Sequence, residues 1–284
     1  MKRFVREQTS ERLKKVQAEL RHAADEPEDA DAIHDLRVSI RRLNQDLRVF
    51  KPWFPASQVK KIRRHLKKLM EVCGAARNCD IAIEVLRAAG CEDQAVWQGL
   101  EKERRRTNRK LRRTLETWQR KDRAREWRKH LEPKGPKSAP KHPAEAARGI
   151  LPAMTDALFR AGRDAAKAGS THHAMHRFRL TIKRVRYTLE LFAHLYGAEA
   201  AAIMDPLKGL QEKLGAINDC AATLVMVQHN PAAAAAVRGL AEKRESEFRK
   251  YWKLHFEPRT RVQWKSALAG KEKELDGNLH SEAR

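Results

Sequence analysis

The sequence has few aromatic residues and no long apolar run, and each shortage narrows what the chain can do. Its 284 residues contain only 17 Phe, Trp and Tyr side chains. Proteins that bind single-stranded nucleic acid without sequence preference stack bases on such rings. The small number of rings therefore disfavours this mode of binding. No stretch approaches the roughly 18 apolar residues that cross a bilayer, and no apolar run follows the basic N-terminus. We therefore expect a cytoplasmic protein.

Cysteine patterns and catalytic motifs are also missing. The four cysteines, Cys73, Cys79, Cys91 and Cys220, form no C-x-x-C pair and have no pair of histidines spaced for metal near them. We find no glycine-rich phosphate loop, no H-E-x-x-H motif and no paired aspartates suited to Mg²⁺. The sequence therefore predicts reduced thiols, no metal site, no cofactor and no enzymatic activity.

Positive charge is what the sequence has in excess. Lys and Arg number 60 against 37 Asp and Glu, which gives a formal net charge of +23. A folded chain with this surplus attracts polyanions first and anionic membrane surfaces second.

Apolar residues recur with helical spacing along most of the chain. Intervals of three and four residues give stripes over 33–50, 59–73 and 175–192, and further helical runs cover about 95–130 and 233–256. Alternating strand patterns of useful length are absent. The fold class predicted is all-α.

A proline-rich joint divides the chain nearly in half. Residues 132–143 contain four prolines and a glycine and cannot be helical throughout. We therefore expect one domain made of two repeats, about 1–131 and 144–260. The polar segment after about 260 is expected to fray.

The two halves resemble each other in sequence. The segment 33–43 aligns with 175–185 at an offset of 142, and 66–75 aligns with 207–216 at an offset of 141. Two blocks at nearly one offset indicate a tandem duplication. Each half is expected to form a helical bundle, with the two bundles related by a pseudo-two-fold axis.

Basic residues form stripes beside the apolar ones in both repeats. The stripes are mostly of one sign, and arginine outweighs lysine on the first helix of each repeat, which suits phosphate oxygens. Solvated surface charge is the alternative reading, as is a structural role for the two histidines. The third helix also carries Lys102, Arg106, Arg112 and Arg113. The candidate anion-binding residues are His34, Arg37, Arg41, Arg42, Arg48, Lys60, Arg63, Arg64, Lys67, Arg105, Arg109, His176, Arg179, Lys183, Arg184, Arg186, Lys208 and Lys250.

The doubled motif resembles that of the CHAD family, the conserved histidine α-helical domain. Its signature occurs as His34-x-x-Arg37-x-x-x-Arg41-Arg42 and again as His176-x-x-Arg179-x-x-x-Lys183-Arg184. The segments 74–80 and 215–219 resemble the family's motif after the second helix. The resemblance implies two four-helix bundles with a basic groove or pore, binding of inorganic polyphosphate and association with polyphosphate granules. It implies phosphate contacts from the eight signature residues and from Lys67 and Lys208.

These observations predict a protein that binds a long phosphate chain without turning it over. Polyphosphate carries about one charge per phosphate and no bases, so its binder needs converging cations and no stacking platform. The alternative is a nucleic-acid-binding protein, which the same charge would serve. The sequence leaves the oligomeric state open.

Overall fold

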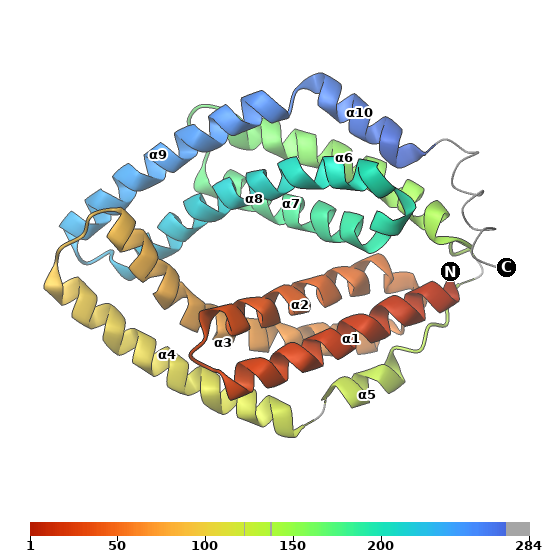
Figure 1. Cartoon of the computed structure of the whole chain (residues 1–284), viewed down its shortest axis with the longest axis horizontal. Helices are drawn as coiled ribbons and strands as arrows, with labels where there is room; N and C mark the ends of the chain where they lie inside the picture. The colour runs from red at the N-terminus through yellow and green to blue at the C-terminus, as the bar shows by residue number, and fades with distance from the viewer. Residues whose placement is uncertain (122, 137, 271–284) are drawn as a thin grey trace. The chain divides into compact units, whose positions relative to one another are not determined.

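The computed structural model describes residues 1–121, 123–136 and 138–270, and these residues form α-helices joined by short turns (Figure 1). The described part of the chain contains no strand, so the all-α prediction is confirmed. The helices are α1 (Lys2–Asp25), α2 (Ala30–Val49), α3 (Ala56–Ala88), α4 (Gln94–Arg120), α5 (Arg123–His130), α6 (Pro143–Ala166), α7 (His172–Phe192), α8 (Gly197–Met226), α9 (Pro231–His255) and α10 (Pro258–Ala269).

The chain divides into two compact units. The N-terminal unit contains residues 2–139 together with 219–240, and the C-terminal unit contains Met1, residues 140–218 and those from 241 on. The division at 139 falls within the proline-rich joint. The second unit is interrupted, because the end of α8 and the beginning of α9 pack with the N-terminal unit.

Helices α1 to α4 form a four-helix bundle in the N-terminal unit. Helix α2 packs against α1 and α3, and α4 packs against the same two helices, so α2 and α4 occupy opposite corners. The apolar stripe predicted over 33–50 is buried on α2, where Leu36, Ile40, Leu43 and Leu47 have no exposed surface. Helix α4 buries Leu111 and Leu115 on its inner side and leaves its outer side to charge.

Two helix caps contact each other within the N-terminal unit. Asp93 begins α4, and its Oδ1 accepts a hydrogen bond of 2.8 Å from the amide of Ala95. Asn230 precedes α9, and its Oδ1 accepts one of 2.8 Å from the amide of Ala233. The Asn230 amide group also donates to Asp93 Oδ2 at 2.6 Å. Each side chain therefore caps its own helix, and the two caps hydrogen-bond to each other. The hydrogen bonds from Asn230, Val96 and Ala95 lower the pKa of Asp93.

The proline-rich joint packs on the corner between α2 and α3. The Lys134 amide donates a 2.8 Å hydrogen bond to the Trp53 carbonyl oxygen. Gly135 has a φ of 32° and lies against the Trp53 ring, where a Cβ atom would overlap the ring carbons. A side chain at 135 would be both strained and obstructed, so glycine fixes the path of the joint here.

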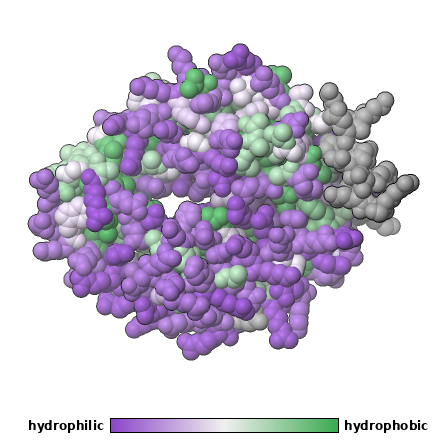
Figure 2. All heavy atoms as spheres, in the orientation of Figure 1, coloured by the Kyte–Doolittle hydropathy of each residue, from purple (hydrophilic) through white to green (hydrophobic). Residues whose placement is uncertain are grey.

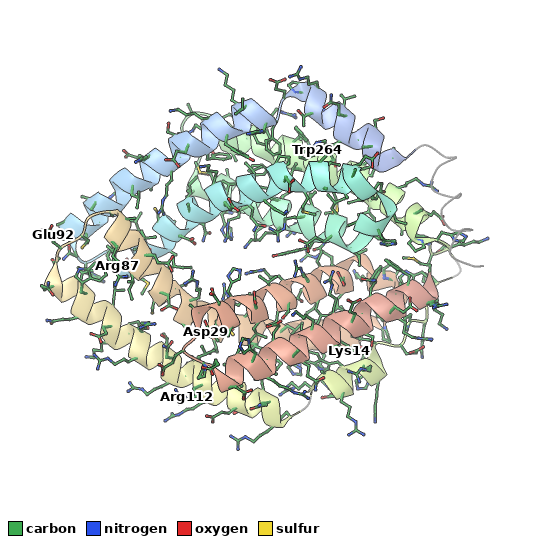
Figure 3. All side chains as sticks on the ribbon, in the orientation of Figure 1. Lys14, Asp29, Arg87, Glu92, Arg112 and Trp264 are labelled. Atoms are coloured by element: carbon green, nitrogen blue, oxygen red, sulfur yellow. The ribbon has the colours of Figure 1, made fainter. Side chains whose placement is uncertain are left out.

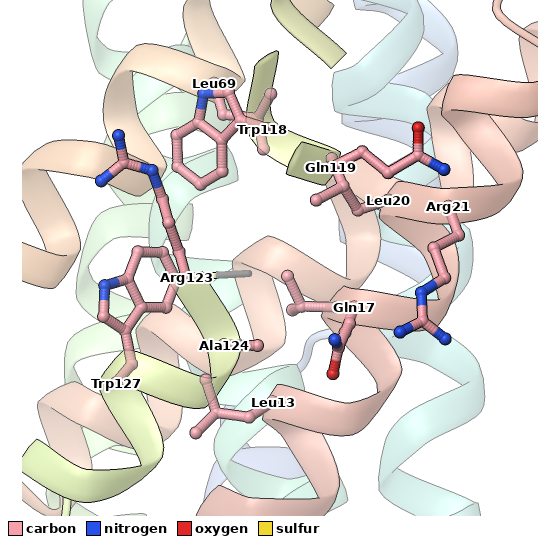
Figure 4. A pocket seen from close by; sticks show the side chains of 11 residues that line it. Leu13, Gln17, Leu20, Arg21, Leu69, Trp118, Gln119, Arg123, Ala124 and Trp127 are labelled. Carbon is pink, nitrogen blue, oxygen red and sulfur yellow. The ribbon is translucent and has the colours of Figure 1, made fainter. Parts of the chain in front are cut away.

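Helix α5 is attached to the bundle by stacked rings and a cation (Figure 4). The guanidinium carbon of Arg123 lies 5.0 Å from the Trp118 ring centroid, and Trp127 meets Trp118 edge-on at 6.0 Å. His65 of α3 stacks on Trp127 at 6.2 Å. Trp118, Arg123 and Trp127 border a small pocket of about 140 Å³ between α1, α3, α4 and α5. Aromatic and cation–π contacts therefore tie a short and strongly basic helix to the bundle.

An aromatic cluster forms the core of the C-terminal unit. Phe159 of α6 has ring centroids of Trp252, Phe256 and Trp264 within 6 Å, at 5.9, 5.8 and 5.7 Å. Helix α6 passes close to this cluster, because a Cβ atom at Gly162 would overlap the Trp252 ring. Glycine thus permits the close packing of α6 against α9.

The expectation that the chain frays after about 260 is wrong for residues 260–269. These residues belong to α10, which buries Trp264 and Leu268 against the C-terminal unit. Asp156 of α6 accepts hydrogen bonds of 2.8 Å from Arg261 and from Lys265. Two buried residues one turn apart are enough to dock a short helix, although the segment is polar on average. The rest of the expected tail lies outside the described residues.

Candidate functional site

A cluster of cations surrounds His34 on the face of α2 that adjoins α3. We use the name His34 cluster for His34, Arg37, Arg41 and Arg77. Arg37 Nη1 donates to the Met70 carbonyl oxygen at 3.4 Å, so its side chain lies along α3. A Cβ atom at Gly74 would come within 3.0 Å of the same nitrogen. The glycine of the second sequence block therefore leaves room for the arginine of the first.

The charges of the cluster act on the histidine. Partial burial of the ring lowers the pKa of His34, and the cations of Arg41, Arg77 and Arg37 lower it further, against an opposing effect of Asp35. A neutral imidazole is thus favoured while the cluster holds no anion. An anion bound among these groups would act in the reverse direction and would favour the protonated ring.

The C-terminal unit carries the equivalent cluster on α7 and α8. We use the name His176 cluster for His176, Arg179, Lys183 and Asn218, all of which are half-buried. His176 Nδ1 lies 3.0 Å from Asn218 Oδ1. An amide oxygen can only accept, so this contact requires a proton on Nδ1. Asn218 stands where the first repeat has Arg77, so the two histidines have different neighbours.

Further candidates lie along α3 and α8. Lys60, Arg63 and Arg64 are exposed and form no ion pair with any described residue. Lys67 lies 3.8 Å from Glu71, and Lys208 lies 3.0 Å from Asp205. Both lysines are exposed, so a stronger anion could replace these weak surface pairs.

Several candidates lie away from the two clusters. The charge of Arg42 acts on Lys15 of α1, which places Arg42 toward α1 rather than toward α3. Arg186 pairs with Glu190 at 3.2 Å and lies over the Tyr187 ring at 5.3 Å, so its guanidinium group is already engaged. Arg48, Arg184 and Lys250 are elsewhere on α2, α7 and α9. All three are half-exposed or more, but they contribute to neither cluster.

Arg105 and Arg109 lie on the outer side of α4. They line hollows of 310 and 380 Å³ that contain no residue of α2. Because α2 and α4 occupy opposite corners of the bundle, these two arginines form a surface separate from the His34 cluster.

Two members of the clusters were not among the candidates from sequence. Arg77 and Asn218 belong to the blocks after the second helix, and the offset of 141 aligns them. That alignment was the sequence signal from which both residues could have been identified as candidates. Their contact with the histidines depends on how α2 packs against α3 and α7 against α8, which the sequence pattern does not specify.

Metal and thiol chemistry have little support at these clusters. Among the described residues, no group of three or more His, Cys, Asp or Glu side chains is placed to hold a metal ion. Cys73 lies beneath the His34 cluster, and burial raises the pKa of its thiol to about 11. A thiol with that pKa is a poor nucleophile at neutral pH. Over the same residues, no helix is both long and apolar enough to cross a membrane.

The fold and the doubled motif define a class of all-helical proteins that present a histidine beside cations in each of two units. The chain belongs to the CHAD domain family, which matches residues 7–228. The resemblance seen in the sequence is thereby confirmed. No curated protein sequence matches the chain significantly.

Two solved structures resemble the chain over nearly its whole length. The CHAD domain from the plant Ricinus communis aligns with a TM-score of 0.60 and 20% identity, covering 96% of this chain and 92% of the plant chain. PptA from Streptomyces chartreusis aligns with a TM-score of 0.64 and 15% identity, covering 93% of this chain and 98% of PptA. At these identities the likeness concerns the fold.

Proposed function

We propose that this protein binds inorganic polyphosphate and does not hydrolyse it. The observation that carries the proposal is the His34 cluster, where Arg37, Arg41 and Arg77 from two helices act on one histidine. Arg77 also pairs with the exposed Glu84 at 3.1 Å, a surface ion pair that a phosphate could replace. Guanidinium groups donate paired hydrogen bonds to phosphate oxygens, and anions relieve the repulsion among the cations. The resemblance to the family supports the same ligand.

The His176 cluster supports a second contact region on the same ligand. It repeats the histidine and two of the cationic positions, so a long chain of phosphates would find similar groups in both units. The half-buried Arg179 and Lys183 are held in place by their surroundings, which reduces the entropy lost on binding. Association with cytoplasmic polyphosphate granules would follow from such binding and is part of the proposal.

The exposed surface of the described residues is suited to a polyanion. Figure 2 shows one face of the molecule, on which hydrophilic side chains prevail with apolar areas among them. The exposed large apolar residues of the described chain are Leu180, Val225, Leu254 and Val262, and none is aromatic. A ligand without bases therefore fits better than a single-stranded nucleic acid.

A titration with long-chain polyphosphate of defined length tests the proposal. If about ten phosphates are neutralised, the log–log dependence of affinity on salt should have a slope of about −7, by analogy with single-stranded nucleic acids. Single-stranded RNA of equal charge should bind more weakly and should be displaced by polyphosphate. A slope near zero, or RNA that displaces polyphosphate, would contradict the proposal.

The absence of turnover needs a separate measurement. We expect no release of phosphate when the protein is incubated with polyphosphate and Mg²⁺ or Mn²⁺, because no group of His, Cys, Asp or Glu in the described residues is placed to hold a metal ion, and the Cys73 thiol is a poor nucleophile. Phosphate release that scales with protein concentration and disappears in an Arg37→Glu variant would make the protein an enzyme.

A further inference from the structure

Helix α4 carries far more positive charge than its counterpart in the second repeat. The offset of 141 aligns residues 102–113 of α4 with 243–254 of α9. The first segment has eight Lys and Arg and one Glu, whereas the second has five Lys and Arg and two Glu. A duplicated phosphate site would place similar charge on both helices, so the excess on α4 requires another explanation.

The excess charge covers the outer side of α4. We define the α4 face as the six cations that project from this side. All six are exposed, whereas Leu100, Leu111 and Leu115 on the inner side are buried. At 100° per residue these cations span about 160° of the helix circumference. The α4 face consists of Arg105, Arg106, Arg109, Lys110, Arg112 and Arg113.

Three cations of this face form ion pairs with carboxylates, and three do not. Arg105 pairs with Glu101 at 2.8 Å, Arg106 with Glu103 at 2.7 Å, and Arg112, which Figure 3 labels, with Glu28 at 3.1 Å. Arg109, Lys110 and Arg113 form no ion pair with any described residue. Like charges three and four residues apart repel on a helix, so an external anion would stabilise this arrangement.

We propose that the α4 face binds duplex DNA through the phosphates of both strands. Helix α4 is about 40 Å long, and a helix with its side chains is about 10–12 Å across, which matches the major groove of about 12 Å. Cations spread over about 160° can reach phosphate backbones on both sides of that groove. A single polyphosphate chain would meet only one line of them. This site is separate from the clusters of the proposed function.

The surroundings of the α4 face favour a duplex over other anions. The exposed large apolar residues all lie outside α4, so none of them is offered for insertion into a lipid layer. Trp118 lines a hollow beside Arg109 but is half-buried, and Arg123 and Trp127 already pack against its ring, so it makes a poor platform for unpaired bases. An RNA duplex has a deep and narrow major groove that does not admit a helix. Binding through phosphates would be largely independent of DNA sequence.

The test measures binding of a labelled two-turn DNA duplex by fluorescence anisotropy, with no polyphosphate present. The variant Arg109→Gln/Lys110→Gln/Arg113→Gln should lose more than tenfold in affinity, and its log–log salt slope should fall by about 2.7, since each lost contact contributes about 0.9. The matched control is Arg238→Gln/Lys243→Gln/Lys253→Gln, three exposed cations of α9 with the same change in net charge. The control should retain affinity within twofold.

Parallel titrations separate this proposal from the proposed function. The α4 variant should bind polyphosphate within twofold of the parent, and an RNA duplex should bind the parent at least tenfold more weakly than DNA. The proposal is wrong if the parent does not bind DNA, or if the α4 and α9 variants lose DNA affinity equally. It is also wrong if the α4 variant loses polyphosphate binding in proportion, which would assign α4 to the polyphosphate site. Unchanged circular dichroism and melting temperature confirm that both variants are folded.

Discussion

The His34 and His176 clusters begin with the same motif but place their histidines in different surroundings. Arg77 adds a cation beside His34, where it lowers the pKa of the ring, whereas Asn218 at the equivalent position holds His176 by a hydrogen bond of 3.0 Å. The first histidine can therefore gain a proton when an anion arrives, whereas the contact with Asn218 fixes the orientation of the second ring. The two clusters share the cations of the first helix and differ in the residue that faces the histidine from the second helix.

Charge reversal in either cluster should have the largest effect on polyphosphate affinity. It tests whether the two clusters contribute equally to binding. Arg37→Glu/Arg41→Glu should lower polyphosphate affinity on the order of 100-fold, because two charge-assisted contacts become repulsive. Arg179→Glu/Lys183→Glu should cause a similar loss. Titration of both variants and of their combination checks this. If one pair of changes has no effect, only one cluster binds the ligand.

Exchanging Arg77 and Asn218 between the clusters should make each histidine behave more like the other. Arg77→Asn should raise the pKa of His34, because it removes a nearby cation, and should weaken polyphosphate binding about tenfold through the lost charge. Asn218→Arg should remove the hydrogen bond to His176 and strengthen binding. Histidine titrations followed by NMR, with affinities measured in parallel, test both changes. An unaltered His34 titration would show that Arg77 is not an effective neighbour.

Two glycines provide a matched pair with a smaller expected effect. Gly74→Ala should displace Arg37, because the new Cβ would lie 3.0 Å from Nη1, and should reduce affinity several-fold. Gly215→Ala meets no atom within 4 Å and should leave binding unchanged. It should also raise the free energy of unfolding by up to about 1 kcal/mol, since alanine favours a helix over glycine. Chemical denaturation and polyphosphate titration of both variants distinguish the two sites.

The smallest expected effect is the pH dependence contributed by His34. Its pKa is lowered in the free protein, so the ring is neutral at pH 7 and binding of an anion should draw in up to about one proton near pH 6.5. Affinity should therefore rise as the pH falls through this range. Calorimetry in buffers of different ionisation enthalpy measures the uptake, and His34→Gln should remove it. Equal uptake by the parent and this variant would assign the proton to another group.

The same lowered pKa has the opposite consequence for stability without ligand. The unfolded chain binds more protons than the folded one between the folded pKa of His34 and its usual value near 6.5. The contribution of His34 to the free energy of unfolding is therefore fully present above about pH 6.5 and is lost as the pH falls from there through the folded pKa. Acid thus destabilises the free protein while it strengthens the complex.

The sequence predicted the helices and the duplicated motif because both depend on local spacing. Stripes such as Leu36, Ile40, Leu43 and Leu47 repeat at intervals that put them on one side of any helix, and all four are buried. The family resemblance followed from the motif alone. The pseudo-two-fold relation of the repeats and the phosphate contacts remain predictions.

The sequence could not specify which neighbouring helix each basic residue faces. Arg41 and Arg42 are adjacent, yet a rotation of about 100° directs one toward His34 and the other toward α1. Arg186 fits the basic spacing, but Glu190 one turn later engages it. Helix α10 was missed because only Trp264 and Leu268 are buried in a polar segment. Each of these outcomes depends on tertiary neighbours.

The pairing of Asp93 with Asn230 bears on the order in which the molecule can assemble. The residues that complete the N-terminal unit, 219–240, are separated from the rest of it by α6, α7 and most of α8. When synthesis reaches the proline-rich joint, the N-terminal unit therefore still lacks residues 219–240. The beginning of α4 is covered only when residues 219–240 have been made. A nascent chain halted at the joint would present that uncovered end to chaperones, and cutting the gene there would divide one folding unit rather than separate two.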